Sequence, residues 1–201
     1  LAGRVERAQP LIDEMARRAA SATLWQAVLL ARPRAAVQLA RGNPAAAIEA
    51  LKPASPYELG QLAGHWVAYL RGQAHLDLRQ GKDAAREFQK VLDLNPRFPV
   101  ALVGLALSQL AQGQAAPAAD TYRRLAAIDS HGASTASMGL ADIALYQGKF
   151  AEAAAELEKG LALDESLKDR DAAALKHVAL AQAHLSRGRA REARTAVDRA
   201  V

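Results

Sequence analysis

The stretch GKDAAREFQKVLDLNP, residues 81–96, predicts one helix that begins after a turn and ends before a proline. Ala84 is followed four residues later by Phe88, and residues four apart lie on the same face of an α-helix. Pro96 comes directly after Leu94 and Asn95, and a proline there stops a helix because it has no backbone N–H to donate. The stretch therefore predicts a helix with a small residue and a large apolar residue on its packed side.

The same order of residues recurs along the whole chain, at glycine spacings of 39, 39, 32, 35 and 40 residues. The glycines are Gly3, Gly42, Gly81, Gly113, Gly148 and Gly188. In five cases an alanine stands five residues after the glycine, and in the third case Ala84 stands three residues after it; the five are Ala8, Ala47, Ala118, Ala153 and Ala193. A larger apolar residue follows each alanine by four positions: Ile12, Leu51, Phe88, Tyr122, Leu157 and Val197. The pattern predicts stacked helical hairpins, because the small residue lets a neighbouring helix approach and the large residue fills the space beside it.

Composition supports helices and excludes several kinds of site. Alanine supplies 49 of the 201 residues, and alanine has the highest helix propensity. The chain has no cysteine, so disulfides and thiolate metal sites are excluded. No apolar run approaches the roughly 18 residues that a membrane helix needs, and we expect a soluble domain. We also expect it to be a piece of a longer protein, whose compartment, cytoplasm or periplasm, the sequence leaves open.

The net charge of +5 is concentrated at the two ends of the chain. Residues 1–41 contain seven arginines and three acidic residues, and residues 187–201 contain five arginines and two acidic residues. One interpretation is a surface that binds nucleic acid or anionic lipid. The other is a set of solvated helix faces, which we favour, and a nucleic-acid partner is not expected.

The fragments 81–96 and 148–164 resemble the second helix of a tetratricopeptide repeat, whose pattern is W-x2-L-G-x2-Y, then A-x3-F, then P. The resemblance covers essentially the whole chain. It implies an all-α fold, a right-handed α-solenoid of helix-turn-helix repeats. The family also implies a protein that binds other polypeptides and has no enzymatic activity.

The spacing divides residues 1–201, as a single array, into one unpaired second helix, four repeats and a truncated last repeat. The predicted bounds are 1–20, 21–56, 57–98, 99–132, 133–170 and 171–201. In the repeat 57–98 the register is ambiguous, since Gly72 and Gly81 favour registers two residues apart. The last helix would expose an apolar face, so self-association into a homo-oligomer is a further alternative.

The stretch from Leu1 to Asp93, including residues 41–60 and 69–76, is similar to the repeat region of bacterial serine/threonine kinases and related signalling proteins. No kinase element is present: the chain has neither a Gly-rich phosphate loop nor a His-Arg-Asp catalytic loop. This second resemblance implies a regulatory or sensor part of a larger bacterial protein.

The family resemblance places the binding groove on the first helix of each repeat. The implied inner-face residues are Tyr69, Gln73, Leu76, Val100, Val103, Leu107, Leu110, Thr135, Met138, Asp142, Leu145, Tyr146, Leu175, Val178, Gln182 and Leu185. Because most of them are apolar and a clamp of Lys, Arg and Asn is missing, we expect the groove to bind an apolar or amphipathic peptide segment. The alternative is that residues such as Val103 and Leu107 belong to the core.

No pattern in the sequence predicts catalysis, a cofactor or a metal site. His177 and His184 are seven residues apart, too far for the i, i+4 pair that binds zinc, and a packed structural role is expected for both. Asp164, Glu165, Asp169 and Asp171 lack the alternating ligands and central glycine of a calcium loop, which favours a solvated turn. Nothing combines a nucleophile, a base and a group that orients it.

Overall fold

The computed structural model describes residues 2–19, 21–58 and 64–200, excepting the side chains of residues 2–4. Within these ranges every regular element is a helix, which confirms the predicted all-α fold class of helix-turn-helix repeats. The chain forms two compact units, Leu1–Gly113 and Gln114–Val201.

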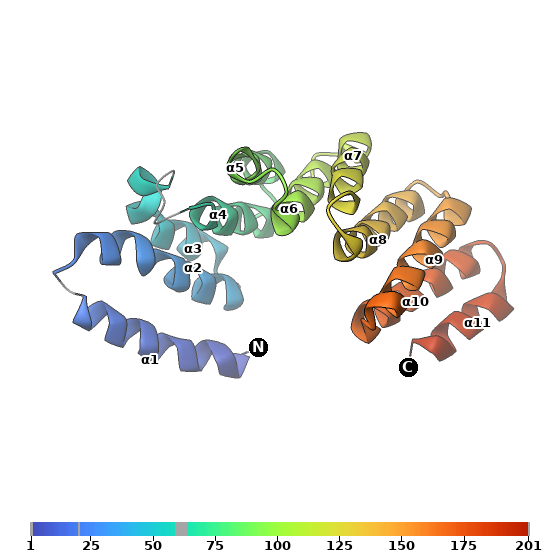
Figure 1. Cartoon of the computed structure of the whole chain (residues 1–201), viewed down its shortest axis with the longest axis horizontal. Helices are drawn as coiled ribbons and strands as arrows, with labels where there is room; N and C mark the ends of the chain where they lie inside the picture. Colours follow the sequence, from blue (N-terminus) through green and yellow to red (C-terminus); the bar gives the residue numbers. More distant parts are fainter. Residues whose placement is uncertain (1, 20, 59–63, 201) are drawn as a thin grey trace. The chain divides into compact units, whose positions relative to one another are not determined.

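The N-terminal unit is a series of helices in which each α-helix packs on the next α-helix of the chain (Figure 1). Its elements are α1 (Ala2–Arg18), η1 (Trp25–Leu29), α2 (Ala31–Ala40), α3 (Pro44–Leu51), η2 (Lys52–Tyr57), α4 (Trp66–Asp77), α5 (Gly81–Leu94) and α6 (Pro99–Leu110). The helix α2 also contacts α4, and α4 contacts α6. Packing between neighbours in sequence is the arrangement of a repeat array.

The C-terminal unit repeats this arrangement with longer helices (Figure 1). Its elements are α7 (Ala115–Ala126), α8 (Ser130–Tyr146), α9 (Phe150–Leu167), α10 (Arg170–Ser186) and α11 (Ala190–Arg199). Successive pairs from α7·α8 to α10·α11 are packed together. Thus α2, α4, α6, α8 and α10 are the first helices of the predicted repeats. The predicted repeat 99–132 contributes α6 to one unit and α7 to the other, and residues 59–63 of the repeat 57–98 lie outside the described residues.

The recurring alanines lie at the packed seams between helices. Five of them are buried: Ala47, Ala84, Ala118, Ala153 and Ala193. The large partners one turn later are buried too, at Ile12, Leu51, Phe88, Tyr122 and Leu157. Val197 differs, with 50% of its surface exposed, because α11 packs chiefly on α10. The alternation of small and large residues is therefore what allows the helices to nest.

The register of the repeat 57–98 is set by Arg79 and not by either glycine. Gly42, Gly113, Gly148 and Gly188 each lie two residues before a second helix and have positive φ angles of 70–75°. The corresponding position before α5 is Arg79, with φ 59°. Counted from Arg79, Ala84 and Phe88 stand at the same distances as in the other repeats. A left-handed residue ends the preceding helix in each case, and here an arginine takes the conformation that glycine adopts most easily.

We expect Ala153→Leu to lower the free energy of unfolding by about 1–3 kcal/mol, because the added atoms overpack the seam between helices. Ala153 is fully buried in α9. Ala155, on the exposed side of the same helix, is the matched control, and Ala155→Leu should change stability by less than about 0.5 kcal/mol. Urea denaturation followed by circular dichroism measures both. Equal losses of stability in the two variants would contradict the placement of Ala153 at a packed seam between helices.

Candidate functional site

Apolar side chains reach the surface on α6, where the family resemblance placed the inner face. Val100, Val103 and Leu107 are spaced by three and four residues and form one stripe. Val100 and Leu107 are exposed and Val103 is half-buried, whereas Leu102 and Leu105 on the packed side are buried. The stripe is thus distinct from the core of the N-terminal unit.

The predicted residues of α4 belong to an aromatic cluster that the sequence interpretation missed. Gln73 Nε2 donates a hydrogen bond of 2.8 Å to Tyr69 Oη. The Tyr69 ring lies edge to face with that of Trp66, at a centroid distance of 5.7 Å, and Trp66 packs in the same way on Phe98 at 5.6 Å. The guanidinium of Arg32, from α2, lies 5.7 Å from the centre of the Trp66 ring. The three-residue spacing of Trp66 and Tyr69 is the signal that could have revealed the cluster.

On α8 the predicted residues Met138, Asp142 and Tyr146 follow one another at intervals of four and so share one face of the helix. Tyr146 is the most exposed of them, at 91%. Met138 is half-buried and packs against the core of the C-terminal unit, beside residues such as Leu157 and Leu180. Met138 is therefore partly a core residue, and only its remaining surface is open to a partner.

The α10 helix carries a second exposed stripe in the C-terminal unit. Val178 is 60% exposed, and Leu175 and Leu185 are exposed to a similar degree. Gln182 lies between them and is also exposed. Helical spacing puts these four on one face, so α10 presents an apolar face that is not part of the core.

Asp142 is the only Asp, Glu, Lys or Arg of α8. Its side chain reaches the surface, yet partial burial raises the pKa of its carboxyl above the usual range. Burial also raises the pKa of the Tyr122 hydroxyl, and the negative charge of Asp142 adds to that shift. Among the described residues Asp142 forms no ion pair. The carboxylate is thus an uncompensated negative charge.

A second, fully buried set of polar groups joins α8, α9 and α10. Lys176 Nζ lies 2.7 Å from Asp164 Oδ2 and 2.9 Å from Ser134 Oγ, and the Ser134 hydroxyl donates to Asp164. Asp164 and Lys176 are 1% and 2% exposed. The expected solvated turn at Asp164 is therefore wrong: α9 continues to Leu167, and the charge of Asp164 is neutralised inside the unit. Because all three groups are enclosed and paired, they serve structure.

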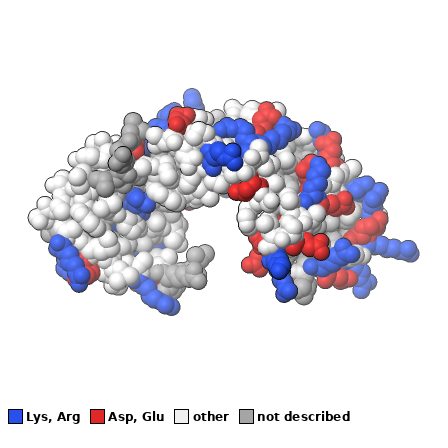
Figure 2. Space-filling view, in the orientation of Figure 1, with Lys and Arg blue, Asp and Glu red and all other residues white. Residues whose placement is uncertain are grey.

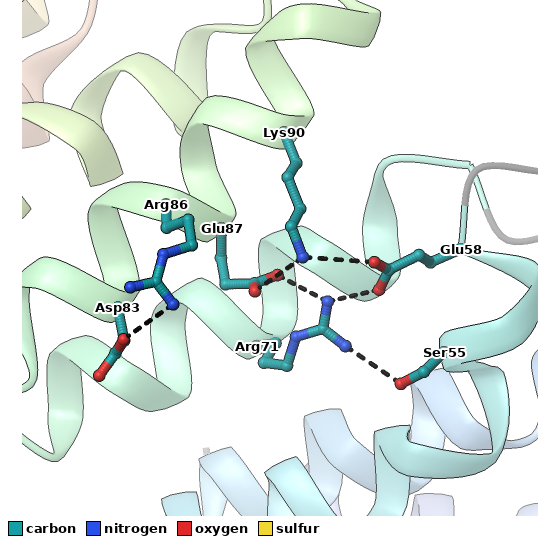
Figure 3. Close-up of polar contacts among 7 residues, drawn as sticks. All are labelled: Ser55, Glu58, Arg71, Asp83, Arg86, Glu87 and Lys90. Atoms are coloured by element: carbon teal, nitrogen blue, oxygen red, sulfur yellow. Dashed lines mark hydrogen bonds and ion pairs between the residues drawn. The ribbon is translucent and has the colours of Figure 1, made fainter.

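An ion network of the N-terminal unit ties η2 to α4 and α5 (Figure 3). Arg71 binds Glu58, lies 2.7 Å from Glu87 and donates to Ser55 at 3.3 Å. Lys90 Nζ lies 3.0 Å from Glu87 and 3.3 Å from Glu58. Burial alone would raise the pKa of Glu58, but the hydrogen bonds and charges of Arg71 and Lys90 outweigh it and lower that pKa. The carboxylates of Glu58 and Glu87 each pair with both Arg71 and Lys90, so the network holds these segments together.

An open groove of about 1020 Å³ lies between α9, α10 and α11, and His177 and His184 line it. His184 is buried and His177 half-buried, and the Nδ1 atom of each has no hydrogen-bond partner among the described residues. Burial, together with the nearby Arg199, lowers the pKa of His177. In the described part of the chain no group of three or more His, Cys, Asp and Glu side chains is arranged to hold a metal ion.

The arginines near the N-terminus are partly neutralised by acidic residues of α1. Arg17 and Arg18 both pair with Glu14, and Arg41 lies 3.4 Å from Glu6. Over the C-terminal unit, positive and negative side chains alternate on the face that Figure 2 shows. This mixed surface favours the solvated-face interpretation of the arginine-rich ends. None of the described helices has the length and hydropathy of a membrane span.

A family model described as "Tetratricopeptide repeat" matches residues 69–133 and 138–201, well over half of the chain. None of the curated proteins matches the sequence.

Solved structures match at low sequence identity and so show the fold alone. A tetratricopeptide repeat protein from Parabacteroides merdae has a TM-score of 0.70 at 15% identity, covering 98% of this chain and 72% of that one. BtubC from P. vanneervenii has a TM-score of 0.67 at 19% identity, with coverages of 98% and 87%. MamA from Desulfovibrio magneticus RS-1 has a TM-score of 0.65 at 20% identity, with coverages of 85% and 91%.

Proposed function

Because the chain belongs to the tetratricopeptide repeat family, we propose that it is a non-enzymatic scaffold whose first helices bind an apolar or amphipathic segment of a partner protein. The fold and family support the general role of a protein-binding scaffold. The resemblance to repeat regions of bacterial signalling kinases adds a regulatory setting to the proposal.

The observation that carries the proposal is the apolar character of the first helices on their unpacked sides. Tyr146 on α8, Val178 on α10 and Leu107 on α6 are all exposed, although each lies on a helix whose other side is well buried. Large apolar side chains exposed in series on one helix face mark a surface for binding. Tyrosine is a frequent anchor at such surfaces, since its ring is both apolar and able to form a hydrogen bond.

The test is a selection of binding segments from a random-peptide library, followed by fluorescence anisotropy of the best peptide against the full chain. We expect Tyr146→Ala to weaken binding at least about tenfold, as truncation of an anchor residue does. Tyr146 is suited to the test because its exposure leaves the fold unaffected, whereas the half-buried Met138 would confound it. Ala155→Glu on α9, an exposed position of a second helix, is the control and should bind normally.

Three results would contradict the proposal. Equal affinities of the wild type and the Tyr146→Ala chain would remove α8 from the binding surface. Binding of nucleic acid that weakens steeply with salt would favour the arginine-rich ends. Exclusive self-association, measured as a mass that increases with concentration, would favour the oligomer.

A further inference from the structure

We propose that the α8 surface selects a partner segment that carries a lysine or arginine among its apolar residues. This inference rests on the proposed function and names the chemistry of the partner. Its basis is the place of one carboxylate, Asp142, between the apolar side chains of Met138 and Tyr146.

The spacing defines what could bind there. Met138, Asp142 and Tyr146 lie one helical turn apart, so the carboxylate is flanked by an apolar group about one turn away on each side. A cationic side chain whose neighbours are apolar would pair with Asp142 while those neighbours cover Met138 and Tyr146. Lysine and arginine also suit such a site because their long apolar stems can lie along the tyrosine ring.

The charges of the surrounding surface favour the same sign of partner. Asp142 has no ion pair within the described residues, whereas the buried Lys176 of α10 is already neutralised by Asp164. Asp171, at the start of α10, is exposed too, but the adjacent Arg170 and the nearby Lys168 offset its charge. The negative charge that favours a cationic partner is therefore that of Asp142, which no base of the described residues offsets.

The partial burial of the Asp142 carboxyl also favours a cationic partner. Its pKa is raised by loss of water around the carboxyl, which means that the charged form is destabilised in the free protein. A cation that binds beside it stabilises the charged form, so binding and ionisation favour one another. A neutral or acidic partner offers no such compensation.

The experiment uses three fluorescein-labelled peptides of about four helical turns that share the same Leu and Phe positions. Their polar positions carry lysine in the first, glutamine in the second and glutamate in the third. We expect the lysine peptide to bind the full chain about three- to tenfold more tightly than the glutamine peptide at about 150 mM salt. The chain has a net charge of +5, so general attraction would favour the glutamate peptide instead, and a preference for lysine must come from a local acid.

Asp142→Asn, which keeps the shape and removes the charge, should abolish the preference for lysine. Glu152→Gln makes the same change of net charge at an exposed position of α9 and should leave the preference intact. Retention of the preference in the Asp142→Asn chain, or binding of the glutamate peptide as tight as that of the lysine peptide, would overturn the inference while the scaffold stands. Failure of all three peptides to bind would contradict the proposed function as well.

Discussion

Lys176→Met is expected to lower the free energy of unfolding of the C-terminal unit by about 3–5 kcal/mol. The ammonium group is enclosed with Asp164, and its loss leaves a carboxylate inside the unit with only the Ser134 hydroxyl to bind it. Urea denaturation followed by circular dichroism measures the change. Both tryptophans, Trp25 and Trp66, lie in the N-terminal unit, so their fluorescence follows that unit in the same sample.

Two further variants separate the buried pair from the general effect of removing a lysine. Lys159→Met breaks an exposed pair with Glu156 and should change stability by less than about 1 kcal/mol. The double change Lys176→Met with Asp164→Leu should regain much of the loss, because a buried ion pair is readily replaced by apolar side chains. If Lys176→Met costs no more than Lys159→Met, the pair does not stabilise the unit.

This buried pair shows what the sequence could not reveal. Lys176 and Asp164 are twelve residues apart and lie in different helices, and Asp164 precedes a run of charged residues that is typical of a solvated turn. Only the packing of α9 between α8 and α10 brings the three groups together. Residue 160 is a glycine, and a larger side chain there would collide with the Lys176 side chain. An added Cβ would lie 2.0 Å from Ser137 Oγ and 2.5 Å from Lys176 Cε. The sequence alone therefore gives no sign of the packing role of Gly160.

The repeat itself could be predicted because its signal is local and recurs. Ala47, Ala118, Ala153 and Ala193 follow their glycines at a constant distance, and all four are buried. The repeat 57–98 was harder to align from its sequence, because its glycine does not stand at the turn. Gly81 begins α5, and Arg79 is the left-handed residue of the turn. A Cβ on Gly81 would lie 3.0 Å from the carbonyl oxygen of Ser108, so that glycine serves close helix packing.

The candidate binding surface could be predicted only in part. Of the predicted residues, Tyr146 on α8 and Val178 on α10 are exposed, but helical spacing gave no measure of how deeply Met138 enters the core. The aromatic cluster depends on Phe98, which lies 32 residues after Trp66 and directly precedes α6, so only the folded chain brings the two rings together. Which of these residues bind a partner stays a prediction until the peptide experiments are done.

Phe88→Ala is expected to destabilise the N-terminal unit by about 3–5 kcal/mol, through lost burial and the cavity that remains. The ring is completely buried, and it lies against Gly72 of α4 and Gly104 of α6, where added Cβ atoms would approach it to 3.0 and 2.4 Å. Both helices therefore lose a contact when the ring is removed. Leu94→Ala, at an exposed position of the same helix, is the control and should cost less than about 1 kcal/mol. Urea denaturation followed by tryptophan fluorescence reports on this unit.

A double-mutant cycle measures the energetic coupling between the Phe88 ring and Gly104. Gly104→Ala alone should cost about 1–3 kcal/mol, because its methyl group would collide with the Phe88 ring. In the Phe88→Ala chain the same methyl enters vacated space, and alanine is the better helix former by about 1 kcal/mol, so the substitution should become neutral or stabilising. Strictly additive effects would mean that the helices move apart instead, and that the close approach of α5 and α6 does not depend on this pair.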